Sequence, residues 1–96
     1  MLDDQRIAKI ADNVRARNGD LAPVLNALCM AEEMGEAVQQ IRRHEGHARR
    51  PATCDEVGEE MADVIISTAV TAQLMGIDLG AHVRAKLDRI MERGGR

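Results

Sequence analysis

The sequence predicts an all-α fold in which four helices form a bundle that assembles into an oligomer. Apolar residues recur three and four positions apart along most of the 96-residue chain, as they do on one face of a helix. The chain has no Phe, Tyr or Trp, which favours helices packed through Leu, Ile, Val, Ala and Met over a sheet. A chain of this length makes one small domain, residues 1–96, that buries only part of its surface alone. We therefore expect a homodimer or a homotetramer.

Residues 3–17 predict a first amphipathic helix, with Asp3 or Asp4 placed to cap its start. Asp20 can cap a second helix, which runs to about His44. We expect the apolar stripe of this second helix to face the core and its carboxylates, Glu33 among them, to lie on the opposite side. The stripe consists of Ala27, Met30, Met34, Val38 and Ile41.

A polar and basic connection over residues 42–52 leads to the second pair of helices. Thr53 and Glu56 fit the capping-box pattern at the start of a third helix. Residues 64–72 of this helix carry no charge, so we expect them to be buried in the bundle or against a second subunit. Asp78 can cap a fourth helix, in which the apolar residues are expected to face inward. These residues are Leu79, Val83, Leu87, Ile90 and Met91.

Charge and cysteine content narrow the class of protein. The formal net charge of −3 argues against a general nucleic-acid-binding protein. Cys29 and Cys54 have neither the spacing of a zinc finger nor the density of a disulfide scaffold, which favours a reducing compartment. No uncharged run approaches membrane-spanning length, and the first residues lack the layout of a signal peptide. We therefore expect a cytoplasmic protein without a nucleic-acid or membrane partner.

Two acidic segments, residues 32–36 and 59–63, lie within the second and third helices. Residues three and four apart share a helix face, so each segment places carboxylates side by side. One such cluster alone is ordinarily a solvated helix face, but the acidic face of the third helix continues into apolar residues. Buried carboxylates need a cation, which basic side chains or a metal can supply. Oxygen ligands of this kind favour Mg²⁺, Mn²⁺ or Ca²⁺, and Mg²⁺ commonly holds substrate phosphates as well.

The pattern Glu33-x-x-Glu36 followed by Glu60-x-x-Asp63 resembles the MazG-type all-α nucleoside triphosphate pyrophosphohydrolases. The similarity covers about residues 22–93. It implies that the four motif acids bind Mg²⁺, with Mn²⁺ as an alternative, and that water attacks the α-phosphorus of a nucleoside or deoxynucleoside triphosphate. The implied products are the monophosphate and pyrophosphate, and the implied role of such a nucleoside triphosphate diphosphatase is to clear unwanted nucleotides.

The resemblance also implies roles for residues around the motif. Glu32 or Glu59, each one residue before a motif acid, is expected to orient the attacking water as a catalytic residue or to complete the metal shell. Lys86 matches a phosphate-contacting lysine of the family. Arg89 and Arg93 extend the same basic stripe and are predicted to bind substrate phosphates, with a solvated face of ion pairs as an equal alternative.

Two other functions stay open at this point. Related enzymes commonly carry Asn four residues after the matched lysine, where this chain has Ile90. A module that binds a nucleotide through a metal without turning it over is therefore one alternative. The other is a helical interaction protein whose acids are simply solvated. Release of pyrophosphate from a nucleotide would distinguish an enzyme from a binding module and from an interaction protein.

Overall fold

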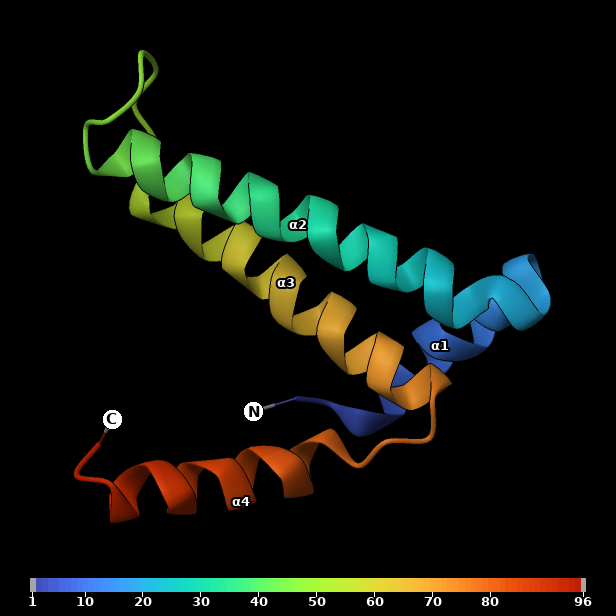
Figure 1. Cartoon of the computed structure of the whole chain (residues 1–96). Coiled ribbons are helices and arrows are strands. Elements are labelled where there is room, and N and C mark those ends of the chain that lie inside the picture. Colours follow the sequence, from blue (N-terminus) through green and yellow to red (C-terminus); the bar gives the residue numbers. More distant parts are fainter. Residues whose placement is uncertain (1, 96) are drawn as a thin grey trace.

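The computed structural model describes residues 2–95, which form α-helices joined by short connections (Figure 1). The elements are α1 (Asp4–Asn18), the 3-10 turn η1 (Gly19–Leu21), α2 (Ala22–His44), α3 (Cys54–Leu74) and α4 (Leu79–Glu92). The predicted all-α class is confirmed. Among the described residues no single helix is both long and apolar enough to cross a membrane, although α3 and α4 together, bent by 116°, pass that test by length and composition.

The helix starts follow the predicted caps at three of four positions. The side chain of Asp3 accepts a hydrogen bond from the first turn of α1, and Asp78 does the same for α4. Thr53 and Glu56 form the reciprocal capping box at the start of α3. The prediction for Asp20 is wrong, because this residue lies within η1. The 3-10 turn already provides a carbonyl acceptor for the first N–H of α2, so the helix begins without a side-chain cap.

The buried core lies at one end of the molecule, where α1 crosses α3 and the start of α2 (Figure 1). It consists of Ile7, Ala11, Val14, Ala22, Ala69, Val70 and Leu74. The uncharged half of α3 is therefore buried as predicted over residues 69–72. Its earlier residues Ile65 and Ile66 are exposed, because α1 does not reach them.

Helices α2 and α3 run antiparallel along a seam whose positions alternate three and four residues apart, as in a coiled coil (Figure 1). On α2 the seam consists of Asn26, Met30, Glu33, Ala37 and Gln40, and on α3 of Val57, Glu60, Val64, Ser67 and Thr71. The side-chain amide of Asn26 donates to Ser67 O at 3.1 Å and to Thr71 Oγ1 at 2.8 Å. The seam thus contains polar groups on both helices and is closed by hydrogen bonds at its core end.

The predicted orientation of α2 is wrong. Glu33 lies in the seam, whereas Met34 and Val38 of the predicted core stripe are 53% and 49% exposed. The two stripes lie next to each other on the helix surface, since Met34 is one residue, or 100° of rotation, beyond Glu33. Periodicity alone reports that a helix has an apolar stripe and does not report which neighbour covers it.

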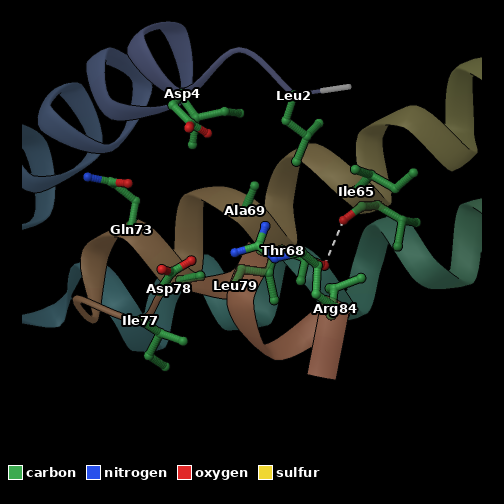
Figure 2. Close-up of a pocket in the computed structure, with 15 residues that line it drawn as sticks. Leu2, Asp4, Ile65, Thr68, Ala69, Gln73, Ile77, Asp78, Leu79 and Arg84 are labelled. Carbon is green, nitrogen blue, oxygen red and sulfur yellow. Dashed lines mark hydrogen bonds between the residues drawn. The ribbon is translucent and has the colours of Figure 1, made fainter. Parts of the chain in front are cut away.

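The predicted inward orientation of α4 holds within one chain only at the start of the helix, where Leu79 packs against the buried core. Val83, Leu87 and Met91 are exposed, and none of the residues of α4 is fully buried. Helix α4 lies apart from α2 and α3 and leaves an open groove of about 1020 Å³, bordered by α3, α4 and the beginning of α1 (Figures 1 and 2). Apolar side chains such as Ile65, Ala69 and Leu79 line this groove.

We predict that Asn26→Ala lowers the free energy of unfolding by about 1–2 kcal/mol, because it removes two part-buried hydrogen bonds across the seam. Urea denaturation at constant protein concentration measures the change. Gln39→Ala, at an exposed position of the same helix, is the matched control and is expected to leave stability unchanged. Equal midpoints for the two variants would contradict a stabilising role for the Asn26 bonds.

Candidate metal centre

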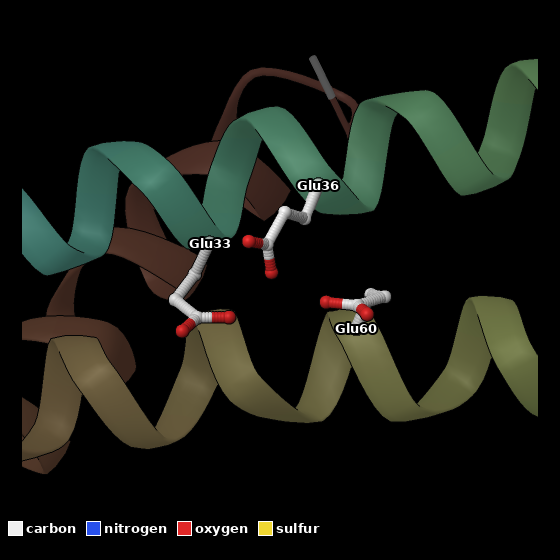
Figure 3. Close-up of side chains that lie close together, drawn as sticks. All are labelled: Glu33, Glu36 and Glu60. Atoms are coloured by element: carbon white, nitrogen blue, oxygen red, sulfur yellow. The ribbon is translucent and has the colours of Figure 1, made fainter.

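Three carboxylates from two helices converge near the middle of the seam (Figure 3). Glu33 and Glu36 come from α2, and Glu60 comes from α3. Each offers one oxygen, and the three oxygens all lie within 4.8 Å of one another. Glu33 and Glu60 are half-buried and Glu36 is exposed, so the cluster is open to solvent on one side.

The position of these acids follows from the seam itself. Glu33 and Glu60 occupy seam positions on antiparallel helices, so their side chains are directed toward each other. Glu36 lies one turn beyond Glu33 and reaches the same space from the side (Figure 3). Asp63 lies one turn beyond Glu60 on α3. The sequence therefore folds locally into a paired acidic site once the two helices adopt this register.

Burial and like charge act together on the two seam acids. Burial raises the pKa of Glu33 above its usual value of 4.5, and the charges of Asp63, Glu36 and Glu60 raise it further. Burial also raises the pKa of Glu60, again with contributions from Glu36 and Asp63. Glu33 and Glu60 thus both lie close enough to the other motif acids to be repelled by them, and no basic side chain of the described residues offsets the raised pKa of either.

The unpaired oxygens of the cluster fit a hard divalent cation. Glu33 Oε2 and Glu60 Oε2 are buried without a hydrogen-bond partner among the described residues. The ion pairs found within residues 2–95 join Arg6 to Asp3 and Arg15 to Asp12, both on the first helix and its cap. A set of carboxylate oxygens, some of them orphaned and mutually repelling, suits Mg²⁺ or Mn²⁺. The residues present therefore fit such an ion.

The other predicted site residues fall into two groups. Glu32 and Glu59 are exposed beside the cluster, and their charges contribute to the raised pKa values of Glu33 and Glu60. The basic residues lie on α4, apart from the seam (Figure 1). Lys86 and Arg89 border a hollow lined by residues of α4 alone, and Arg93 is the C-terminal cap of that helix. The single chain does not gather them around the acids.

Gln40, which the sequence analysis did not single out, is a further polar residue of the seam near the cluster. It follows Glu36 by four residues on the same side of α2, and it occupies the next seam position after Ala37. Its Oε1 is buried without a hydrogen-bond partner among the described residues. An unpaired buried acceptor there suits a donor such as a water molecule of a hydrated cation. The alternating three and four spacing of residues 26, 30, 33, 37 and 40 was the available signal.

Comparison with known proteins gives one positive result. A family model described as the MazG nucleotide pyrophosphohydrolase domain matches residues 22–94. The matched segment contains α2, the connection, α3 and α4, and so includes both acidic segments and the basic stripe of α4. No curated protein and no solved structure matches the chain.

We predict that Glu60→Gln raises the melting temperature of the metal-free protein at neutral pH, because it removes one of the repelling charges. The raised pKa of Glu60 means that the folded state binds a proton more tightly than the unfolded state does. Its stabilising contribution is complete below pH 4.5 and is lost as the pH rises through the raised pKa. The advantage of the variant should therefore disappear as the pH falls toward 4.5.

Thermal denaturation in EDTA over this pH range measures the difference between Glu60→Gln and the wild type. Glu45→Gln removes an exposed acid at the end of α2 and is the matched control. Added Mg²⁺ should raise the melting temperature of the wild type and of the control more than that of Glu60→Gln. A metal-free Glu60→Gln protein that is less stable than the wild type at neutral pH would contradict repulsion within the cluster.

Proposed function

Because the chain belongs to the MazG nucleotide pyrophosphohydrolase family, we propose that it is a Mg²⁺-dependent hydrolase of nucleoside or deoxynucleoside triphosphates. The proposed products are the nucleoside monophosphate and pyrophosphate, and the proposed role is removal of unwanted nucleotides. The observation that carries the proposal is the cluster of Glu33, Glu36 and Glu60 within the matched segment, with three oxygens within 4.8 Å.

The four motif acids would hold the ion, Glu33 and Glu36 from α2 and Glu60 and Asp63 from α3. When bound, Mg²⁺ supplies charge neutralisation for the phosphate oxygens and lowers the pKa of a coordinated water. The acids contribute a fixed geometry, since the antiparallel seam positions Glu33 against Glu60 before any ligand arrives. Their mutual repulsion in the empty cluster favours uptake of a cation.

Glu32 and Glu59 are the proposed proton acceptors for the attacking water. Both are exposed acids next to a seam acid, so their side chains can approach the bound nucleotide because they are not packed between the two helices. A carboxylate that is not neutralised by direct metal binding remains basic enough to accept a proton from a water of lowered pKa. The water oxygen would then form a bond to the α-phosphorus as the bond from that phosphorus to the α,β-bridging oxygen breaks, which gives the nucleoside monophosphate and releases pyrophosphate.

Lys86, with Arg89 and Arg93, is the proposed contact for the substrate phosphates. A lysine ammonium is a compact charge that suits a polyphosphate. The chain has no aromatic side chain on which a base could stack. We therefore propose that phosphate and metal contacts provide most of the binding energy and that selectivity among bases is weak.

We predict that the protein releases pyrophosphate from a panel of nucleoside and deoxynucleoside triphosphates when Mg²⁺ is present. Glu36→Gln and Asp63→Asn should each lower kcat by at least about 100-fold. Loss of a residue that binds the metal directly should lower activity at least as much as loss of a residue that only orients a metal ligand. Chromatographic identification of the products measures the reaction.

Asp12→Asn serves as the control for loss of an acid, because Asp12 is exposed on α1 and outside the matched segment. Its activity should equal that of the wild type. Release of orthophosphate in place of pyrophosphate would contradict the proposed reaction, as would full activity in the Glu36 and Asp63 variants. Mg²⁺-dependent binding of nucleotide without turnover would indicate the non-catalytic alternative.

A further inference from the structure

A thiol and an imidazole are in contact at the end of the α2–α3 pair that lies opposite the buried core (Figure 1). His44 is the last residue of α2, and Cys54 is the first residue of α3. Cys54 Sγ lies 3.6 Å from His44 Nε2, within hydrogen-bonding reach of a sulfur atom. Both side chains are exposed, so a dissolved reactant can approach the pair.

The second nitrogen of the His44 ring determines its tautomer. Nδ1 lies 3.0 Å from Ala52 O, and because a carbonyl oxygen can only accept a hydrogen bond, Nδ1 carries a proton. In the neutral ring Nε2 is therefore unprotonated, and it meets the thiol as an acceptor. An activated cysteine consists of a nucleophile, a base and a group that orients the base. Cys54, His44 and Ala52 O provide these three parts.

Positive charge lies near this thiol. Cys54 is at the N-terminus of α3, where unbonded N–H groups and the helix dipole favour an anion. Hydrogen bonds with Thr53 lower the pKa of Glu56 in the first turn of α3. The charges of Arg50 and Arg43 lower this pKa further, so both guanidinium groups lie close to the start of the helix. They can attract an anionic reactant toward Cys54.

Two other interpretations of the contact fit less well. A metal ion would need a third ligand, whereas within residues 2–95 the group of three possible ligands is the glutamate cluster of the seam. A purely structural free cysteine is ordinarily buried, and Cys54 is exposed. Cys29 on α2 is also free and exposed, but in the described part of the chain it has no hydrogen-bonded base. The two thiols therefore differ in their capacity to react.

We propose that Cys54 is a site of covalent modification, at which the Cys54–His44 pair reacts with an anionic low-molecular-weight disulfide. Excess reduced thiol reverses such a modification, so its extent follows the redox state of the surroundings. Disulfides of this transient kind are the ones that form in reducing compartments.

The reaction is a thiol–disulfide exchange. His44 Nε2 takes the proton of the thiol, and Cys54 Sγ attacks one sulfur of the disulfide. A new S–S bond forms between Cys54 and that sulfur as the original S–S bond breaks. The other half of the reactant leaves as a thiolate, which takes the proton from His44. The Cys54 sulfur is thereby oxidised to a mixed disulfide, and the departing sulfur is reduced to a thiol.

The rate of mixed-disulfide formation tests the proposal independently of any hydrolase activity. Glutathione disulfide at neutral pH is the reactant, and mass spectrometry of the full chain without metal or nucleotide measures its addition. Cys29→Ser leaves Cys54 as the only thiol, and Cys54→Ser leaves Cys29 as the matched control. Cys54 should react at least about 10-fold faster than Cys29. In concentrated urea the two rates should become equal, because the difference depends on the fold.

His44→Gln, made in the Cys29→Ser chain, tests the base. Glutamine retains hydrogen-bonding groups but does not take up a proton, so the Cys54 rate should fall at least about 5-fold. His47→Gln removes an exposed imidazole of the same connection and should leave the rate unchanged. Equal rates for the two thiols in the folded chain would overturn the proposal. So would an undiminished rate in His44→Gln, an equal loss in His47→Gln, or a difference between the thiols that persists in urea.

Ionic strength tests the charge of the reactant. Salt at about 1 M screens exposed charges beyond about 3 Å, so it should slow the reaction of Cys54 with glutathione disulfide. A rate that does not fall with salt would overturn the selection of an anionic disulfide by Arg43 and Arg50.

Discussion

The repulsion between carboxylates in the α2–α3 seam is the constraint on which the rest of this structure depends. Glu33 and Glu60 occupy positions where apolar residues would give the most stable helix pair, and each has a buried oxygen without a partner. Hydrogen bonds lie on either side of the acids instead. At the core end Asn26 bonds across the seam to α3, and beyond the other end His44 Nδ1 of α2 donates to Ala52 O of the connection at 3.0 Å.

The interactions that stabilise the helix pair lie in a different part of the seam from the acids of the candidate metal centre. The buried core and the hydrogen bonds lie toward the ends of the seam, so the helices can hold their spacing while the middle remains short of positive charge. A site preorganised in this way does not need to rearrange when a cation enters. The orphaned Oε1 of Gln40, one turn along, extends the same polar stretch.

The polar seam also determines where the large apolar residues of α2 lie. Since the seam positions of α2 include Asn26, Glu33 and Gln40, most large apolar side chains of that helix lie one residue away and point to solvent. The acids in the seam thus leave these large apolar residues of α2 without cover from α3.

Local physics determined much of this protein from sequence alone. The helical class and the caps at Asp3, Thr53 and Asp78 follow from spacing and side-chain hydrogen bonding within a few residues, and the same spacing places carboxylates side by side within each acidic segment. Tertiary structure decided which stripe of α2 meets α3, because two stripes lie one residue apart and their burial depends on distant segments. It likewise decided that α4 packs on its own chain only through Leu79 and leaves Val83 and Leu87 exposed, since the sequence of an apolar helix face does not specify which segment covers it.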